Sequence, residues 1–129
     1  MKTVLVVEDS RAEQRLIVLL LQQSGLKVAL ADSAESAIVW LTENSQPDLI
    51  VLDIVMPGIS GLDFCRQIRT NDQFKDIPIV FCSSKDQEFD RFWALRQGGN
   101  DYITKPFQPE QLLNTVSELI NSSPIGINQ

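Results

Sequence analysis

The most informative absence in this sequence of 129 residues is histidine. Without an imidazole, the chain lacks the side chain that most often serves as general base or metal ligand at neutral pH, and it has no histidine phosphoryl carrier. Any chemistry must therefore come from carboxylates, hydroxyls, lysine and a metal ion bound through oxygen.

Cysteines, basic residues and long apolar runs are also scarce. The two cysteines, Cys65 and Cys82, match no metal-binding spacing and no disulfide framework, which favours the reduced cytoplasm. With 11 Lys and Arg against 17 Asp and Glu, the net charge of −6 argues against a nucleic-acid-binding surface. The longest apolar run, Leu16 to Leu21, is too short to cross a bilayer, and the apolar stretch near Met1 is too short for a signal peptide. We expect a cytoplasmic protein that binds neither nucleic acid nor membrane.

Five short apolar segments alternate with five segments that carry helix signals. We predict the apolar segments to be strands, at Thr3–Val7, Lys27–Ala31, Leu49–Asp53, Ile77–Cys82 and Tyr102–Thr104. Several of them lack polar alternation, which is typical of strands covered on both faces. The alternation predicts a doubly wound α/β fold with a five-stranded parallel sheet. We expect one domain over residues 1–121 and a flexible C-terminal tail over residues 122–129.

Start and stop signals delimit the predicted helices. The start signals are pairs of residues three positions apart: Ser10 with Glu13, Asp32 with Glu35, and the looser pairs Ser60 with Asp63 and Ser84 with Gln87. Pro109 suits the first turn of the last helix, and Gly25 suits the end of the first.

Polar side chains follow the ends of four predicted strands. They are Glu8, Asp9, Asp53, Ser83 and Lys105. In an open parallel α/β sheet, the functional crevice lies beyond the carboxyl ends of the strands, so these side chains should meet. Three neighbouring carboxylates repel unless a cation intervenes, and a set of oxygen ligands suits Mg²⁺. Lysine and a hydroxyl suit phosphate oxygens, and a carboxylate can form an aspartyl-phosphate.

Each of these residues also has a simpler interpretation. Glu8, Asp9 and Ser83 resemble helix caps, Asp53 suits a turn, and a lone Lys105 is typical of a solvated surface. Taken singly, the simpler interpretations are favoured. Taken together, they require several independent coincidences at one edge of the sheet, so we favour a common site.

Four motifs carry a resemblance to a known family. "VLVVEDS", "LIVLDIVMPGISG", "IVFCSS" and "GGNDYITKPF" occur in the order and at the spacing of the receiver domain of bacterial two-component response regulators. The chain resembles the stand-alone, chemotaxis-type members over about residues 3–121. The resemblance implies a flavodoxin-like sheet in the order 2-1-3-4-5. It also implies a cis peptide bond between Lys105 and Pro106.

The resemblance assigns a role to each polar residue at the strand ends. Asp53 becomes the phosphoacceptor, Asp9 a direct Mg²⁺ ligand, Glu8 a ligand mostly through water, and the Val55 carbonyl a further ligand. Ser83 and Lys105 would hold the phosphoryl oxygens. Ser83 and Tyr102 would form the conformational switch, with Tyr102 following the state of Ser83.

The implied function is a phosphorylation-controlled signalling switch. A sensor histidine kinase or a histidine phosphotransfer protein would donate the phosphoryl group. The surface of the fourth helix, fifth strand and fifth helix would then bind a downstream target protein. The chain would catalyse only its own phosphoryl transfer and autodephosphorylation. We expect a monomer, with dimerisation on phosphorylation left open.

The sequence departs from common members of the family in three places. Serine stands at position 83 instead of the more frequent threonine, and Gly98-Gly99-Asn100 stands where Gly-Ala-Asp is frequent, which should loosen the end of the fourth helix. The fourth helix also carries Phe89, Phe92 and Trp93. We predict a partner surface that includes Phe92 or Trp93 beside Tyr102, while core packing of these aromatics remains an equal alternative.

Two further residues are expected to set the rate of hydrolysis. Val55 and Lys85 stand two residues beyond Asp53 and Ser83, and neither side chain positions a water for attack.

Two rival functions share parts of this pattern. A pseudo-receiver that binds a partner without phosphorylation remains the alternative, although the complete acid, serine and lysine set argues against it. A phosphatase of the haloacid-dehalogenase kind would need an Asp where Val55 stands.

Overall fold

The computed structural model describes residues 1–121, in which five strands alternate with five helices. In chain order the elements are β1 (Thr3–Val7), α1 (Arg11–Gln23), β2 (Lys27–Ala31), α2 (Ala34–Glu43), β3 (Leu49–Leu52), α3 (Gly61–Arg69), β4 (Ile79–Ser83), α4 (Glu88–Arg96), β5 (Asp101–Thr104) and α5 (Pro109–Asn121). The tail expected over residues 122–129 lies outside the described residues.

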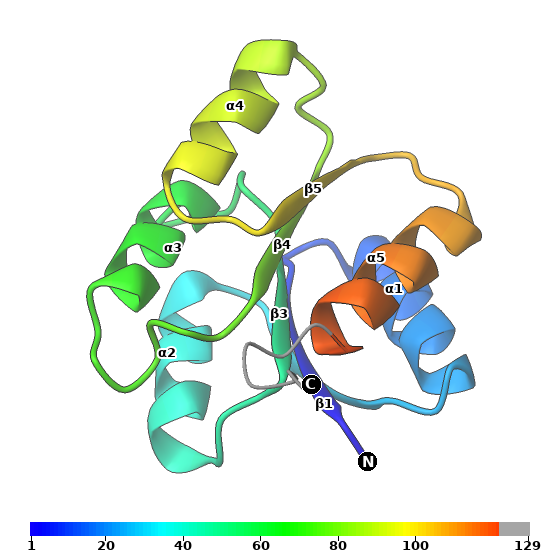
Figure 1. Ribbon diagram of the computed structural model, residues 1–129, viewed down its shortest axis with the longest axis horizontal. Helices are drawn as coiled ribbons and strands as arrows, with labels where there is room; N and C mark the ends of the chain where they lie inside the picture. Colours follow the sequence, from blue (N-terminus) through cyan, green and yellow to red (C-terminus); the bar gives the residue numbers. More distant parts are fainter. Residues whose placement is uncertain (122–129) are drawn as a thin grey trace.

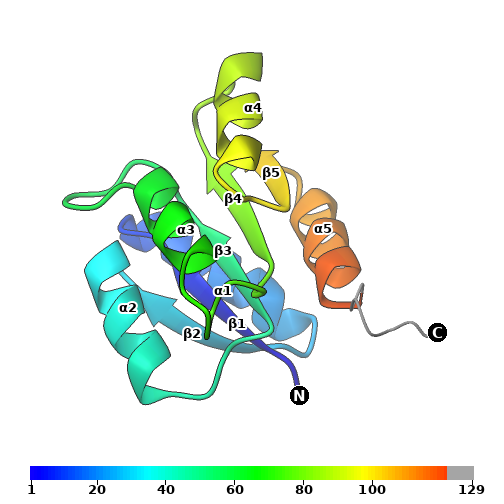
Figure 2. The same cartoon turned by 60° about the vertical axis from the view of Figure 1, so that its left-hand side comes forward.

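The five strands form one parallel sheet in the order β2-β1-β3-β4-β5, which confirms the predicted topology. Helices α1 and α5 cover one face, and α2, α3 and α4 lie on the other (Figure 1). Figure 2 shows the same two layers from a turned view, with α4 standing above the rest. The strand order reverses where β1 pairs with β3, so a ligand crevice is expected at the carboxyl ends of these two strands.

Alternate residues of each central strand feed two separate cores. One core lies under α2, α3 and α4, and the other lies under α1 and α5. Along β4, for example, Ile79 and Phe81 enter the first core, while Val80 and Cys82 enter the second. This two-sided burial explains why the strands read as continuous apolar runs. Cys65 and Cys82 are free and buried, and no helix among residues 1–121 is long and apolar enough to span a bilayer.

Three strands have boundaries that differ from prediction, the smallest difference being at β5, which begins at Asp101 rather than Tyr102. β3 ends at Leu52, so Asp53 stands just past the ladder rather than inside it. β4 begins at Ile79 instead of Ile77 because Pro78 has no N–H to donate to a neighbouring strand. At its other end β4 reaches Ser83 rather than Cys82, since Ser83 pairs with Thr104 of β5, and Ser83 is fully buried.

Helix starts are confirmed at α1, α3 and α5, whereas two predicted caps are wrong. Ser10 and Ser60 accept hydrogen bonds from the third residue of their helices, and Pro109 opens α5. Gly25 follows α1 with φ of +85°, as its position at the helix end requires.

The two wrong caps are displaced along the chain. At α2 the reciprocal pair is Ser33 with Ser36, one residue beyond the predicted Asp32 with Glu35, because the Ser36 hydroxyl can serve the Ser33 N–H at 3.2 Å. α4 begins at Glu88 rather than after Ser84, since the Gln87 N–H donates to Asp90 Oδ2 at 3.2 Å.

The amino ends of β4 and β5 are joined by Arg69, at the end of α3. Its guanidinium donates to the carbonyl oxygens of Gly98, Lys75 and Ile77 at 2.9, 3.0 and 2.7 Å, and to Asn100 Oδ1 at 2.9 Å. The loosening expected at Gly98-Gly99-Asn100 stays a prediction, although several contacts oppose it. Those residues are held by hydrogen bonds, and a Cβ at position 99 would come within 2.7 Å of the Phe81 ring.

Candidate functional site

Asp53 leaves the end of β3 at the predicted crevice. Its backbone N–H donates to the Val7 carbonyl at 3.0 Å, which extends the pairing of β3 with β1 by one step. Its Oδ1 accepts the Ile54 N–H at 2.7 Å, and the residue is 8% exposed. This carboxylate is therefore anchored by backbone on both sides while one oxygen, Oδ2, remains directed toward other side chains.

Gly61, the first residue of α3, is a contributor that the sequence interpretation missed. Its N–H donates to the Ile54 carbonyl at 2.8 Å, and a Cβ at this position would overlap the carbonyl oxygen of Asp53. The start of α3 therefore packs directly on the backbone that carries Asp53. The signal was present as a glycine just after the Ser60 cap, but a close approach between two backbones cannot be read from spacing alone.

Glu8 and Asp9 follow β1 beside Asp53. One carboxylate oxygen from each of the three acids lies within 4.8 Å of the others. Glu8 is 2% exposed, and its Oε2 accepts the Ser10 N–H at 3.0 Å, whereas Asp9 is open to solvent. Burial raises the pKa of Glu8 against the hydrogen bonds from Lys105 and the Ser10 backbone, and the charge of Asp53 raises it further. An all-oxygen set with one exposed member fits a hard divalent cation that keeps part of its water shell.

Lys105 places its ammonium among these carboxylates. Nζ lies 2.6 Å from Glu8 Oε1 and 3.4 Å from Asp53 Oδ2, and it also pairs with Glu13 of α1. Burial alone lowers the pKa of this ammonium. The hydrogen bonds to Glu13 and Glu8 outweigh burial, so the pKa is raised and the group stays charged.

Glu13 is the second residue that the sequence interpretation missed. It was assigned to a capping box, but the N–H of Ser10 that it was expected to satisfy is taken by Glu8. Its carboxylate turns instead to Lys105, from which it is separated by most of the chain. No local pattern encodes such a long-range contact.

Ser83, Lys85 and Tyr102 form a connected set beside the carboxylates. Ser83 Oγ accepts the Lys85 N–H at 3.2 Å, and the Ser83 carbonyl accepts the Lys105 N–H at 2.8 Å. The Tyr102 hydroxyl donates to the Lys85 carbonyl at 2.6 Å, and burial raises the pKa of Tyr102. The structure therefore brings the predicted switch residues together through the backbone of Lys85.

Tyr102 corrects one part of the predicted partner surface. The side chain is only 4% exposed because it lies under α4 and packs 6.3 Å from the Phe81 ring, centroid to centroid. It therefore offers little area to a partner. The predicted cis peptide bond between Lys105 and Pro106 is confirmed.

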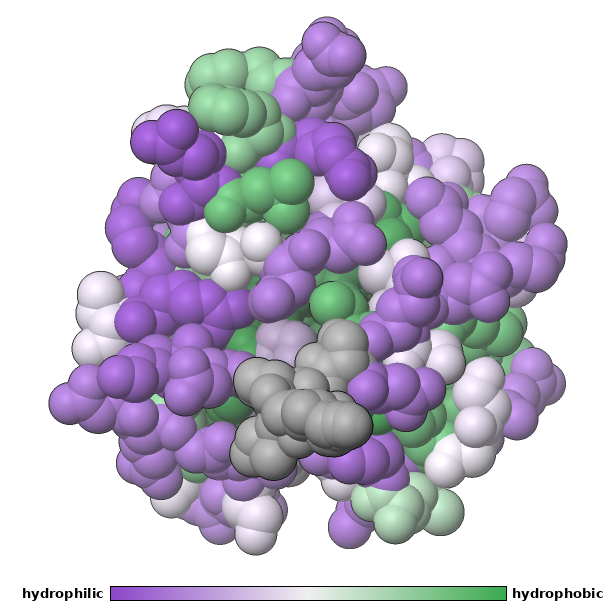
Figure 3. All heavy atoms as spheres, in the orientation of Figure 1, coloured by the Kyte–Doolittle hydropathy of each residue, from purple (hydrophilic) through white to green (hydrophobic). Residues whose placement is uncertain are grey.

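The aromatic residues of α4 are exposed. Phe89, Phe92 and Trp93 are 67%, 55% and 43% exposed, which argues against the core alternative. Phe89 stacks on Trp93 with ring centroids 6.2 Å apart, and the Arg96 guanidinium lies 5.6 Å from the Phe92 centroid. Apolar surface gathers over α4 at the top of the space-filling view (Figure 3).

Val55 and Lys85 are both exposed, Val55 by 60%. Val55 stands two residues after the buried Asp53, so the chain emerges at the surface directly beyond the carboxylate. This placement leaves their predicted influence on hydrolysis open to experiment.

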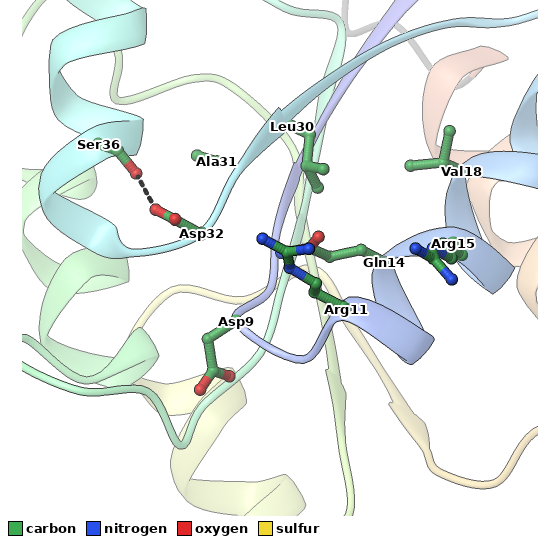
Figure 4. Close-up of a pocket in the computed structure, with 9 residues that line it drawn as sticks. All are labelled: Asp9, Arg11, Gln14, Arg15, Val18, Leu30, Ala31, Asp32 and Ser36. Carbon is green, nitrogen blue, oxygen red and sulfur yellow. Dashed lines mark hydrogen bonds between the residues drawn. The ribbon is translucent and has the colours of Figure 1, made fainter.

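A hollow of about 600 Å³ lies between α1 and the start of α2. Asp9 borders it, together with Arg11, Arg15 and Asp32, and Asp32 is bonded to Ser36 (Figure 4). Asp53, Ser83 and Lys105 do not line this hollow. The convergent polar groups at the strand ends, rather than this hollow, therefore define the candidate site.

Known proteins match the chain over nearly its whole length. The sequence pattern of the response regulator receiver domain matches residues 4–117. Protein PilH of Pseudomonas aeruginosa is 35% identical over 120 residues, covering 93% of this chain and 98% of PilH. The phosphate regulon transcriptional regulatory protein PhoB of Escherichia coli is 34% identical, and the chain spans 56% of its length.

Solved structures match the fold as well. The receiver domain of Francisella response regulator 1452 superimposes with a TM-score of 0.85 at 26% identity, over 94% of this chain and 98% of that one. The phosphorylated cyanobacterial phytochrome response regulator RcpA superimposes with a TM-score of 0.78 at 30% identity, over 93% and 91%. The chain belongs to the receiver domain family of two-component response regulators.

Proposed function

We propose that this receiver domain is a phosphorylation switch in which Asp53 accepts a phosphoryl group from a phosphohistidine. The donor would be a sensor histidine kinase or a histidine phosphotransfer protein. The observation that carries the proposal is the ammonium of Lys105 held 2.6 Å from Glu8 and 3.4 Å from Asp53, at the edge where three carboxylates meet.

The transfer step follows from the placement of Asp53. Because Oδ1 is held by the Ile54 N–H, Oδ2 is the oxygen available to attack phosphorus. A new O–P bond forms as the P–N bond of the phosphohistidine breaks, and the electron pair of that bond returns to the leaving imidazole. When bound by Glu8, Asp9, Asp53 and the Val55 carbonyl, Mg²⁺ would neutralise charge on the transferring group.

Lys105 and Ser83 would then hold the new phosphoryl oxygens. Lys105 has three donors and already lies at Asp53 Oδ2. Ser83 Oγ at present accepts a bond from the Lys85 N–H, and its own hydroxyl hydrogen is the donor that it can offer a phosphoryl oxygen. Phosphorylation adds about −1.5 to −2 charges, enough to reorganise these contacts.

A continuous set of contacts supports transmission to α4. Lys85 is bonded through its N–H to Ser83 and through its carbonyl to Tyr102. The Tyr102 carbonyl accepts a bond from Arg91 of α4 at 3.2 Å. Movement of Ser83 toward a phosphoryl group would therefore shift the contacts that hold α4. The exposed Phe92 and Trp93 of α4 are the proposed target-binding residues. Target binding here rests on the α4–β5–α5 surface, with Tyr102 acting from beneath it.

Mass spectrometry with a small acyl-phosphate donor tests the proposal. With Mg²⁺ present, the wild-type protein should gain one acid-labile phosphoryl group, and Asp53→Asn should gain none. Asp63→Asn, which alters an exposed carboxylate on α3, serves as the matched control and should label normally. Equal labelling of wild type and Asp53→Asn would refute the assignment, and no labelling of either would favour the pseudo-receiver alternative.

A further inference from the structure

Lys105 is shared among three carboxylates that differ in their access to water. Glu8 is 2% exposed at its side chain and Asp53 10%, whereas Glu13 is 41% exposed. The contacts with Glu8 and Glu13 are short, and the 3.4 Å contact with Asp53 is the longest of the three. The ammonium is therefore held mainly by the two glutamates and only loosely by the proposed phosphoacceptor.

Among residues 1–121, the Glu13 carboxylate has no other hydrogen bond or ion pair in the site that accounts for its position. The N–H of Ser10, which a glutamate at this place in a helix often satisfies, already donates to Glu8 Oε2 at 3.0 Å. The Glu13 backbone N–H uses Ser10 Oγ, so α1 starts without help from the Glu13 side chain. The Glu13 carboxylate therefore does not cap α1, and it forms an ion pair with Lys105.

The two glutamates would respond differently to a phosphoryl group on Asp53. Glu8 is buried, so it cannot release the ammonium without leaving an unpaired charge out of water. Glu13 can release it at small cost because its side chain is 41% exposed and can turn to solvent, and it lines a largely apolar pocket of about 340 Å³. Leu16, Ile17, Pro106 and Phe107 form most of that pocket's walls.

We propose that Glu13 is a positioning residue that draws Lys105 away from Asp53 and so opposes the phosphorylated state. The inference rests on the proposed function, because the phosphoryl group is the ligand for which Glu13 competes. A phosphoryl group on Asp53 would draw the ammonium toward itself, and the ion pair with Glu13 resists that movement. The negative charge of Glu13 acts in the same direction, since it repels the incoming anion.

Glu13→Gln tests this directly. The substitution keeps the shape of the side chain and removes its charge, so Lys105 becomes free to approach Asp53. We expect the mutant to bind beryllofluoride, a tetrahedral mimic of the phosphoryl group, about threefold more tightly in the presence of Mg²⁺, as suits a partly exposed ion pair. Isothermal titration calorimetry gives the dissociation constants. Glu110→Gln, which removes an equal charge from an exposed position on α5, should bind like the wild type.

A double-mutant cycle separates positioning from simple repulsion. If Glu13 acts through Lys105, the gain from Glu13→Gln should shrink when it is made in a Lys105→Gln background. A gain of the same size in both backgrounds would overturn the positioning role. Unchanged or weaker binding by Glu13→Gln would overturn it as well, because Glu13 would then be supporting Lys105.

A crystal structure of Glu13→Gln supplies a readout that does not depend on ligand binding. The Lys105 Nζ to Asp53 Oδ2 distance should fall below 3.4 Å. An unchanged distance would count against the inference even where affinity rises. Absence of beryllofluoride binding in every variant, wild type included, would instead refute the proposed function together with the competition built on it.

Discussion

Two cations lie at opposite ends of the parallel strands, one among neutral acceptors and the other among carboxylates. Arg69, at the amino ends of β4 and β5, donates to three backbone carbonyls and one side-chain amide. Lys105, just beyond the carboxyl end of β5, lies among the carboxylates of Glu8, Glu13 and Asp53. The first cation meets only neutral acceptors, and the second meets more negative charge than it can balance.

The difference separates a structural cation from the one that we propose to act on the phosphoryl group. Around Arg69 burial is the main influence and lowers the pKa of the guanidinium, which still remains charged. The planar guanidinium donates to each of its neighbouring carbonyl and amide oxygens, so these oxygens do not call for a metal ion or another ligand. Around Lys105 the surplus of carboxylate oxygens favours a second cation, and the ammonium favours an anion. That imbalance is what a site for a metal ion and a phosphoryl group requires.

The largest effect is expected at the structural cation. Arg69→Met should lower the free energy of unfolding by about 3 kcal/mol, because several partly buried acceptors lose their donor at once. Urea denaturation measures the change. It should be the same with and without Mg²⁺, because the junction lies at the edge of the sheet away from the acids.

Arg66→Met on the same helix is the matched control for this change. Arg66 is exposed and pairs with Asp63 and Gln97 at the surface, so its loss should cost about 1 kcal/mol or less. A loss of stability in Arg69→Met as small as that in Arg66→Met, or a loss that Mg²⁺ reverses, would contradict the distinction between the amino and carboxyl ends of the strands.

The next effect concerns the surplus of carboxylates. Mg²⁺ at ten times its dissociation constant should stabilise the wild type by about 1.4 kcal/mol. Asp9→Ala should lose most of this, because Asp9 supplies the exposed carboxylate of the acidic set. Thermal unfolding with and without Mg²⁺ measures the difference. Asp32→Ala removes a nearby exposed carboxylate outside that set and should keep the full response, and an unchanged response in Asp9→Ala would contradict the metal assignment.

The sequence predicts one of these two edges much better than the other. Glu8, Asp9, Asp53, Ser83 and Lys105 could be placed together because each follows a strand, and parallel strands bring their carboxyl ends to one edge. The Arg69 junction escaped notice because its acceptors are mainly backbone carbonyls, which every residue carries. Side-chain chemistry leaves a mark in the sequence, whereas a junction built on backbone groups does not.

The same reason accounts for the misassigned side chains. Glu13 was assigned to a capping box from the local sequence, but its carboxylate pairs with Lys105, which only the fold brings near. Tyr102 was expected at the surface, yet α4 covers it and the Lys85 carbonyl takes its hydroxyl. Local signals fixed where α1 begins and where β5 lies, and packing decided where these two side chains point.

A smaller effect is expected from Tyr102→Phe, which removes the hydroxyl that contacts the Lys85 carbonyl at 2.6 Å. Loss of this buried bond should lower the free energy of unfolding by about 1 kcal/mol. If Tyr102 also carries the signal from the charged edge to α4, the mutant should still take a phosphoryl group on Asp53 while the fluorescence response of Trp93 to phosphorylation weakens. Trp40→Phe removes the other indole and isolates that response. A full Trp93 response in Tyr102→Phe would exclude the hydroxyl from the switch.

The smallest effect is expected on the rate of hydrolysis, from Val55, which is 60% exposed and stands two residues after Asp53. Hydrolysis of an aspartyl-phosphate needs a water in line with phosphorus, opposite the Asp53 oxygen. The branched, apolar Val55 offers that water no hydrogen bond, and Lys85 cannot accept a proton from it while charged. Because positioning of the nucleophile is most of what phosphoryl transfer requires, self-dephosphorylation of the wild type should be slow.

Val55→Asn should quicken that hydrolysis, since the amide can orient the attacking water. We expect about a threefold faster decay, which corresponds to about 0.7 kcal/mol of barrier. The measurement is loss of phosphoprotein after the donor is removed, with Mg²⁺ kept present. Val39→Asn makes the same change at an exposed position of α2 and should decay at the wild-type rate. A Val55→Asn protein that decays no faster would mean that water reaches phosphorus under the control of other groups, with Lys85 the next to substitute.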